Sequence, residues 1–124
     1  MVIGIGVDII EIDRIRSSIE KFGDSFLRKI FTDGEIEYCR DKGSKYTHYA
    51  GRFAAKEAVY KALSEFIPDL WWKDIEVVND DAGRPSIRRF GKIQEFLGES
   101  YDLKISISHS HRDAVCYAIL QNKT

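Results

Sequence analysis

The sequence predicts an α+β fold, in which a small, mainly antiparallel sheet packs on a long central helix. Three observations predict it. Segments typical of strands lie at both ends of the chain, the later ones come in pairs joined by short turns, and about twenty helical residues lie between the two ends. Paired strands with short connections favour antiparallel hairpins, and helices kept apart from the strands are typical of α+β folds.

The predicted elements follow one another without linkers or repeats. In chain order they are a strand over 2–9, helices over 11–23, 24–31 and 32–40, a central helix over 47–66, a hairpin within 74–89 with its turn at 81–83, a helix over 92–98, and a hairpin of strands 102–108 and 114–120.

Local signals in the first half set these bounds. The first strand alternates glycine with valine and isoleucine, and it presents Asp8 at its C-terminal end, where a helix follows. In the next helix isoleucine and phenylalanine recur every three or four residues, Gly23 ends it, and a second short helix follows. The residues T-D-G-E at 32–35 match a capping box, with Thr32 accepting from the backbone and Glu35 reaching back.

The second half is bounded by turn residues. Pro68 limits the central helix, because proline disfavours the α conformation in the residue ahead of it. The tight turn D-A-G at 81–83 separates two strand-like runs, and H-S-H-R-D at 109–113 separates two more.

Size and composition limit the class of protein. With 124 residues, 44% of them hydrophobic, the chain is expected to form one domain over 1–124. A formal net charge of −1 gives no general attraction to nucleic acid. Cys39 and Cys116 match no disulfide framework or zinc spacing, so we expect reduced thiols in a cytoplasmic protein. No signal peptide is expected, and no run approaches the roughly 20 apolar residues of a membrane span.

The central helix carries an unusual set of charges beside its predicted core face. Glu57 and Lys61 lie one turn apart, and the alanines around them would leave a groove for a ligand. The alternative is an ordinary surface pair that stabilises the helix by about 0.2–0.5 kcal/mol. The residues of the predicted core face, which fall on one arc at about 100° per residue, are Tyr49, Phe53, Tyr60, Leu63 and Phe66.

Arg52 and Lys56 project within or beside this apolar arc. A charge there without a partner would cost several kcal/mol, so an anionic group should meet them. The sequence leaves open whether that group is a protein carboxylate or a phosphate of a ligand.

Asp8 also has two interpretations. It can cap the helix that begins near residue 11. Alternatively, Asp8 and Glu57 supply two oxygens to Mg²⁺, which commonly keeps its other positions for phosphates and water.

The segment S-H-S-H places His109 at the tip of a strand and His111 two residues later. No third histidine or cysteine lies nearby, which argues against zinc. We expect His109 to donate to an anion and His111 to lie in a surface turn. Gly83 fits a hairpin turn, and it would also allow the backbone to approach a flat ligand closely.

Five segments also match, in order and spacing, the motifs of one enzyme family. They are GIGVDIIEIDRI at 4–15, FTDGEIEYC at 31–39, AGRFAAKEAVYKAL at 50–63, DIEVVNDDAGRP at 74–85 and ISISHS at 105–110. The chain therefore resembles the holo-acyl-carrier-protein synthases, the short bacterial type of 4′-phosphopantetheinyl transferase. This resemblance implies Mg²⁺-dependent transfer of 4′-phosphopantetheine from coenzyme A to a serine of acyl carrier protein, which leaves adenosine 3′,5′-bisphosphate. It further implies a homotrimer with active sites between subunits.

The resemblance implies roles for the residues singled out above. Asp8 and Glu57 match metal ligands, and Lys61 matches a lysine that meets the phosphates and stabilises or protonates the leaving oxygen. The serine proton would pass to Glu57 or to a water held by the metal. The coenzyme A contacts implied in the same way are Arg52 and His109 at the phosphates and Gly83, Arg84 and Pro85 beside the adenine. Lys56 and Glu35 belong to motifs without an assigned role.

The first two helices resemble the surface with which this family meets the acidic helix of its carrier protein. The basic residues of this surface are Arg14, Lys21 and Arg28, with Phe26 between them. The alternative is an ordinary solvated face, because acidic residues lie among the basic ones.

Two other functions compete with transfer. The opening strand with its aspartate also suits a ribonuclease-H-like or actin-like nucleotide domain, although the early run of hairpin strands is missing. A non-enzymatic module that binds coenzyme A or a nucleotide would use Arg52 and His109 and would bind no metal at Asp8 and Glu57.

Overall fold

One long helix, α4 (Lys45–Leu63), organises the structure, a computed structural model that describes residues 1–123. The other elements, in chain order, are β1 (Val2–Glu11), α1 (Ile12–Phe22), α2 (Asp24–Ile30), α3 (Asp33–Arg40), the 3₁₀ helix η1 (Trp72–Asp74), β2 (Val77–Asn79), β3 (Pro85–Ile87), α5 (Gly91–Leu97), β4 (Tyr101–His109) and β5 (Asp113–Asn122). The predicted order of elements is confirmed, with their ends shifted by up to three residues.

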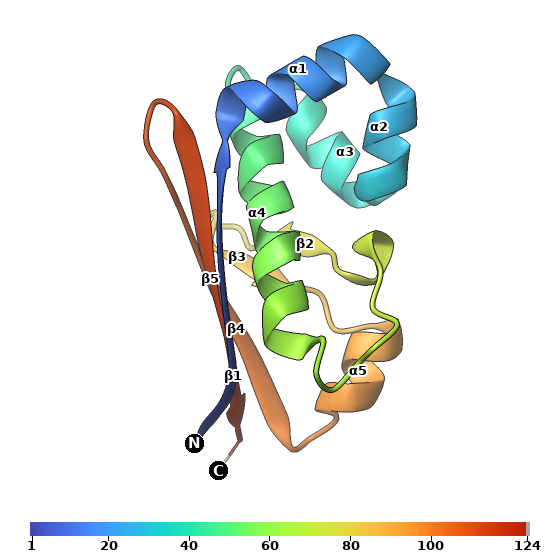
Figure 1. Cartoon of the computed structure of the whole chain (residues 1–124), viewed down its shortest axis with the longest axis vertical. Coiled ribbons are helices and arrows are strands. Elements are labelled where there is room, and N and C mark those ends of the chain that lie inside the picture. Colours follow the sequence, from blue (N-terminus) through green and yellow to red (C-terminus); the bar gives the residue numbers. More distant parts are fainter. Residues whose placement is uncertain (124) are drawn as a thin grey trace.

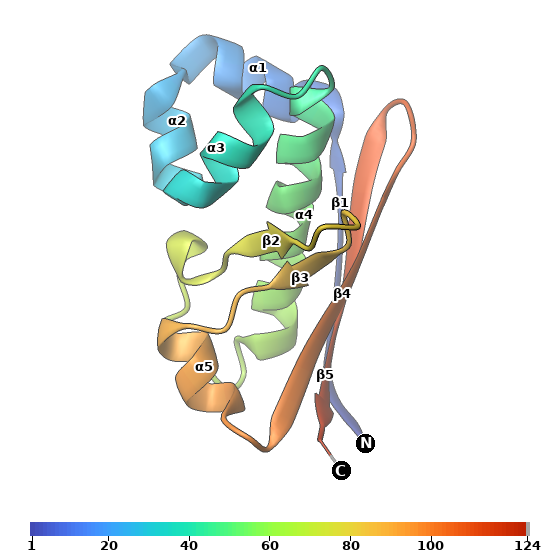
Figure 2. The same ribbon diagram turned by 180° about the vertical axis from the view of Figure 1, so that it is seen from behind.

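The strands form two antiparallel sheets, which confirms the predicted α+β class. The larger sheet has the order β1-β5-β4, so the first strand of the chain pairs with the last. The smaller is the β2–β3 hairpin, which contacts α4 and β4. Helix α4 covers one face of the larger sheet, with α1, α2 and α3 at one end of the molecule and α5 at the other (Figures 1 and 2).

Helix α4 lies unusually close to β1, because both surfaces lack large side chains. A Cβ atom added at Gly6 would overlap the backbone carbonyl of Ala58, and one added at Gly4 would lie 2.5 Å from the carbonyl oxygen of Ala62. The alanines of α4 that face the sheet are buried; they are Ala54, Ala55, Ala58 and Ala62. Glycine on the strand and alanine on the helix therefore set the distance between the two layers.

This packing corrects two predictions about the central helix. The alanines form the core face and leave no groove for a ligand, so that prediction is wrong. The aromatic arc is only partly buried: Tyr49 and Leu63 lie in the core, but Tyr60 is 43% exposed. The physical reason is that β1 presents glycines, against which only small side chains fit.

Strand β1 extends further than the sequence indicates. It pairs with β5 as far as Glu11 opposite Asp113, so Asp8 lies inside the strand and not at its end. Helix α1 has Glu11 at its N-cap position, and Asp8 lies outside that turn. The predicted place of Asp8 at a strand-to-helix junction is therefore wrong, and so is its alternative role as a cap.

The capping box at the start of α3 is confirmed. The Thr32 side chain accepts from the backbone N–H of Glu35, and the Glu35 carboxylate accepts from the N–H of Thr32 at 2.9 Å. Unlike an ordinary capping residue, Glu35 is fully buried.

The predicted state of the cysteines agrees with the structure. Cys39 and Cys116 are both buried and unpaired. Burial raises the pKa of Cys39 to about 11 and that of Cys116 to about 12, so both thiols stay protonated near neutral pH. Within residues 1–123, none of the helices combines the length and the apolar character that crossing a bilayer requires.

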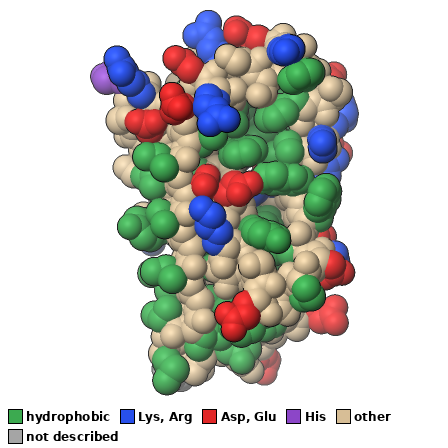
Figure 3. Space-filling model, viewed as in Figure 1, with side chains coloured by type: hydrophobic (Ala, Val, Ile, Leu, Met, Phe, Trp, Pro, Cys, Tyr) green, Lys and Arg blue, Asp and Glu red, His purple; other side chains and the backbone are tan. Residues whose placement is uncertain are grey.

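The face of the larger sheet that points away from α4 is rich in exposed apolar side chains. No helix or strand among the described residues covers this face (Figures 1 and 2), and Figure 3 shows hydrophobic side chains gathered along the strands. The most exposed of them, called here the outer sheet face, are Ile5, Val7, Ile9 and Tyr117. An uncovered apolar surface of this kind marks a site of association.

The close contact between β1 and α4 predicts a strong effect of one added methyl group. Replacing Gly6 by alanine should lower the free energy of unfolding by about 3 kcal/mol, because backbone on both sides must move apart. The measurement is urea unfolding followed by circular dichroism. Gly43→Ala is the matched control and should change stability by less than about 0.5 kcal/mol, since its added Cβ meets nothing within 4 Å. Equal stability of the two variants would contradict the packing constraint.

Candidate active site

Two carboxylates and a lysine meet where α4 crosses β1. Asp8 comes from the strand, and Glu57 and Lys61 come from adjacent turns of the helix. The Lys61 ammonium donates to the Asp8 carboxylate at 3.3 Å and to the backbone carbonyl of Val7 at 2.9 Å. Acidic and basic side chains come together near the middle of this face of the molecule (Figure 3). We call Asp8, Glu57 and Lys61 the carboxylate centre.

The electrostatics of this centre favour a bound cation. Burial raises the pKa of Glu57 above its usual value, the negative charge of Asp8 raises it further, and Lys61 acts in the opposite direction. Two carboxylates that repel each other are stabilised by a divalent cation between them. Among residues 1–123 no group of three or more histidine, cysteine, aspartate and glutamate side chains could hold a metal. A pair of carboxylate oxygens fits Mg²⁺, which keeps several positions for water and phosphate.

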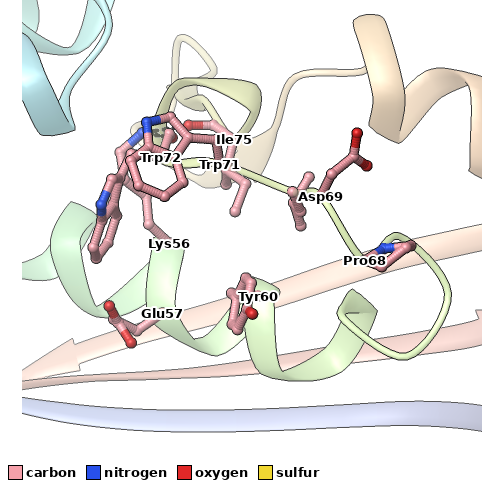
Figure 4. A pocket seen from close by; sticks show the side chains of 9 residues that line it. Lys56, Glu57, Tyr60, Pro68, Asp69, Trp71, Trp72 and Ile75 are labelled. Carbon is pink, nitrogen blue, oxygen red and sulfur yellow. Dashed lines mark hydrogen bonds between the residues drawn. The ribbon is translucent and has the colours of Figure 1, made fainter.

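A cavity of about 480 Å³ opens beside Glu57. Glu57 lies at one end and Pro68 at the other, with the segment between Pro68 and Ile75 facing α4 (Figure 4). The residues that line it are Lys56, Glu57, Tyr60, Pro68, Asp69, Leu70, Trp71, Trp72 and Ile75. Its volume lies in the range of small-molecule sites, and most of its lining is apolar. We call it the Glu57 cavity.

Lys56 has the anionic partner that the sequence analysis expected, and the partner is a protein carboxylate. Its ammonium lies 2.7 Å from the Glu35 carboxylate, and both side chains are completely buried. It also donates to the backbone carbonyls of Trp72, at 3.0 Å, and Ile75. Burial lowers the pKa of Lys56, and the Glu35 carboxylate opposes this change.

Arg52 is a second buried cation of α4, and its partners differ from those of Lys56. Its side chain is nearly buried, with the residue 4% exposed. The guanidinium donates to the side-chain oxygen of Asn79 at 2.5 Å and lies over the ring of Tyr38, 4.1 Å from the centroid. Within residues 1–123 the Nε atom has no hydrogen-bond partner and no carboxylate forms an ion pair with this arginine. A buried cation with neutral neighbours and an unused donor is suited to a bound anion.

Arg52 lies in a second hollow of about 200 Å³, which we call the Arg52 hollow. The predicted residues Gly83, Pro85 and His109 line it as well, so the structure brings four of the six expected coenzyme A contacts together. Lys61, the fifth, lies at the carboxylate centre instead. Arg84 is exposed and does not line the hollow. The lining, with the residues already named, is completed by Tyr38, Ser44, Thr47, His48, Gly51, Asn79 and Ile107.

The turn between β2 and β3 is held by its own polar groups. The Asp80 carboxylate accepts from the backbone N–H groups of Ala82, at 3.0 Å, and Arg84, at 2.9 Å. Gly83 has φ 86°, a conformation that favours glycine, and the space where its Cβ would lie is open. The turn therefore presents bare backbone to the Arg52 hollow.

Seven residues that line this hollow were not predicted from the sequence, and two of them, Asn79 and His48, interact with Arg52. Asn79 connects Arg52 to the turn, because its amide also donates to the Gly83 carbonyl at 3.0 Å. Its position directly before the D-D-A-G turn was the available signal. His48 lies on the first turn of α4, and burial followed by the charge of Arg52 lowers its pKa below the usual value. Nothing in the sequence pattern sets His48 apart.

The carboxylate centre and the Arg52 hollow lie on different sides of α4. Arg52 and Glu57 are five residues apart, which separates them by about 7.5 Å along the helix and by about 140° around it. The Glu57 cavity and the Arg52 hollow share no lining residue. One chain therefore does not gather all the predicted site residues into one place.

The predicted docking residues lie on the surface formed by α1 and α2. Arg14, Lys21 and Arg28 are all exposed. Arg14 and Lys21 are seven residues apart on α1 and so lie on one side of it. Arg28 lies 3.8 Å from Asp33 in an exposed ion pair. His111 lies in the exposed turn between β4 and β5, as expected.

Known proteins match this chain over nearly its whole length. The model of the 4′-phosphopantetheinyl transferase superfamily matches residues 4–119. A holo-[acyl-carrier-protein] synthase of Protochlamydia amoebophila is 45% identical over 120 residues, covering 96% of this chain and 98% of the relative. A crystal structure of a holo-(acyl-carrier-protein) synthase from Bacillus anthracis in complex with CoA (3′,5′-ADP) has a TM-score of 0.78 at 36% identity and covers 100% and 99% of the two chains.

A second solved structure has the same fold. The holo-[acyl-carrier-protein] synthase of Helicobacter pylori in complex with coenzyme A has a TM-score of 0.78 at 32% identity, covering 94% of this chain and 99% of that one. The resemblance stated from the motifs is confirmed. The alternative of a ribonuclease-H-like or actin-like domain is wrong, and so is that of a non-enzymatic module, because the matching relatives are named synthases over nearly their full length.

Proposed function

Because this chain belongs to the 4′-phosphopantetheinyl transferase superfamily, and within it is an enzyme of the holo-acyl-carrier-protein synthase family, we propose the following reaction. The enzyme transfers 4′-phosphopantetheine from coenzyme A to a serine of apo acyl carrier protein, requires Mg²⁺, and releases adenosine 3′,5′-bisphosphate. The observation that carries the proposal is the carboxylate centre, where two carboxylates from different elements meet a lysine.

Asp8 and Glu57 are the residues that would hold Mg²⁺. Their carboxylates would supply oxygen ligands; the pKa of Glu57 is raised first by burial and then by the negative charge of Asp8. When bound, the metal would supply positive charge to the diphosphate as its anhydride bond breaks.

In the transfer, the serine oxygen forms a bond to the phosphorus that carries pantetheine. The bond from that phosphorus to the bridging oxygen breaks, and adenosine 3′,5′-bisphosphate leaves with the electron pair. The serine proton passes to the Glu57 carboxylate or to water. Lys61, which is half exposed and forms an ion pair with Asp8, would stabilise or protonate the leaving oxygen. Positioning and electrostatics account for most of the catalysis in such phosphoryl chemistry.

The Arg52 hollow is proposed to hold the nucleotide end of coenzyme A. The unused Nε donor of Arg52 suits a phosphate oxygen, and His109 offers a second donor at the rim. The open backbone at Gly83 and the ring of Pro85 give a flat surface for adenine. With its nucleotide end held in this way, coenzyme A could extend its diphosphate to the carboxylate centre.

We propose that the complete site is shared between two subunits of a homotrimer. One observation is the position of the two halves of the site on different sides of α4, because one molecule of coenzyme A must contact both. Another is the outer sheet face, whose side chains include Ile9 at 65% exposure and Ile5 at 62%. A second copy of this chain is the partner that would cover it.

The surface of α1 and α2 is proposed to bind the carrier protein. Arg14, Lys21 and Arg28 suit an acidic helix, and charge complementarity of this kind mainly speeds encounter and orients the partner. We further propose that the chain forms a single domain over 1–124 and acts in fatty acid biosynthesis in the cytoplasm. The two buried free thiols support that reducing compartment.

Removing one charge from the carboxylate centre should abolish transfer. Glu57→Gln keeps the side-chain volume and loses a metal ligand, so kcat/KM should fall at least about 10²-fold. The measurement is intact-mass spectrometry of apo acyl carrier protein incubated with coenzyme A and Mg²⁺, with EDTA in a parallel sample. Glu65→Gln, at an exposed position after α4, is the control and should transfer normally. Unaltered turnover by Glu57→Gln would exclude the metal role.

A site shared between subunits predicts complementation. Asp8→Ala and Arg52→Ala should each be inactive alone, because each damages one half of the site. Mixed trimers assembled from both variants should regain activity, since an intact Asp8 from one subunit can meet an intact Arg52 from its neighbour. The measurement is transfer after the two variants are coexpressed and purified as a mixture. No recovery, in a preparation that sediments as a trimer, would show that each site comes from one chain.

Reversing a charge on α1 should affect one substrate and not the other. Arg14→Glu should raise KM for acyl carrier protein about tenfold, because like charges would then face each other. KM for coenzyme A should stay within about twofold of the original value, since Arg14 lies outside both cavities. Steady-state kinetics with each substrate varied in turn make the measurement. A parallel rise in both constants would contradict the docking role.

A further inference from the structure

The buried pair of Lys56 and Glu35 has no part in the reaction described above. The two groups lie 2.7 Å apart, and neither side chain has any exposed surface. Taking two charges out of water is costly, and an apolar pair of similar volume often serves a core equally well or better. The pair therefore calls for a role beyond core stability.

The contacts of Lys56 show what the pair connects. Besides Glu35, its ammonium donates to the backbone carbonyls of Trp72, the first residue of η1, and of Ile75, which directly follows η1. All three donor positions of the ammonium are thereby used. One side chain of α4 thus binds α3 and the segment around η1 at a single point.

Glu35 holds the next part of the same segment. Its second carboxylate oxygen accepts from the backbone N–H of Val77 at 2.8 Å, in addition to the capping contact with Thr32. Between them, Lys56 and Glu35 hold the backbone at Trp72, Ile75 and Val77. The stretch from η1 to the start of β2 is therefore held by hydrogen bonds to buried charges.

This stretch forms one wall of the Glu57 cavity. Trp71, Trp72 and Ile75 line the cavity on the side opposite α4, and Glu57 directly follows Lys56 in the helix (Figure 4). The hydrogen bonds of the Lys56 ammonium therefore set the distance between this wall and Glu57. We call Trp71, Trp72 and Ile75 the tryptophan wall.

We propose that Lys56, oriented by Glu35, is a positioning residue that holds the tryptophan wall against the pantetheine arm of the donor. The inference rests on the proposed function, in which the phosphorus that carries the arm lies at the carboxylate centre and the arm extends away from it beside Glu57. The Glu57 cavity is the space that opens there, and its apolar lining with Asp69 near the far end suits a chain of methylene and amide groups. Lys56 touches neither substrate nor metal in this role.

Kinetics with Lys56→Met test the proposal, because methionine keeps the length of the side chain and removes the charge. KM for coenzyme A should rise about tenfold. The inhibition constant of adenosine 3′,5′-bisphosphate, which lacks the arm, should stay within about twofold. A purely structural role would lower the amount of active enzyme and leave KM unchanged, or would weaken both ligands together. Either result would overturn the proposal.

Tryptophan fluorescence gives a second readout without turnover. The chain has two tryptophans, and both belong to the wall. In the original protein coenzyme A should shift the emission, whereas adenosine 3′,5′-bisphosphate should not. In Lys56→Met the emission of the free protein should already be red-shifted, and the response to coenzyme A should be lost. An unchanged spectrum and response would overturn the proposal.

Two further variants separate positioning from stability. Glu35→Gln combined with Lys56→Met removes both charges, so it carries the test if Lys56→Met alone fails to fold. Leu120→Ala removes a buried side chain of β5 that does not line the cavity; it should lose stability and keep both KM and the fluorescence response. If the original protein transfers nothing, the proposed function fails. If it transfers normally while Lys56→Met matches Leu120→Ala, only this inference fails.

Discussion

The close approach of α4 to β1 is the constraint on which the rest of the structure depends. Gly4 and Gly6 present bare backbone, and Ala58 and Ala62 lie against it with no room for one more methyl group. This contact brings Glu57 and Lys61 close to Asp8, although about fifty residues separate the strand residue from the helix residues in the sequence. A wider spacing would separate the two carboxylates and leave each as an ordinary surface group.

Helix α4 also holds two buried cations whose environments differ. Lys56 meets a buried carboxylate and two backbone carbonyls, so all three donors of its ammonium have partners inside the protein. Arg52 meets a neutral amide and an aromatic ring, and its buried Nε donor has no partner among residues 1–123. The first arrangement holds a wall in place, and the second suits an anion from outside. Burial alone would not separate these roles, because both side chains are almost completely shielded from solvent.

Much of the fold could be predicted because its signals are local. The capping box at Thr32 and Glu35, the glycine after α1 and the turn at Gly83 each depend on a few neighbouring residues. The core face of α4 could not be predicted from its periodicity, since large aromatic residues suggested one face and the glycines of a distant strand required another. For the same reason the alanines, which as a strip of small side chains suggest a ligand groove, are in fact the buried contact with the sheet.

The sequence by itself determined the class of fold, the membership of a transferase family, and the residue types at the site, because motifs state which side chains are present and in what order. Only the tertiary structure decided their partners. It placed Asp8 within β1, paired Lys56 with Glu35, joined Arg52 to Asn79, and put the two halves of the site on different sides of α4. The physical reason is that partners of buried charges come from segments far apart in the chain, and packing alone brings those segments together.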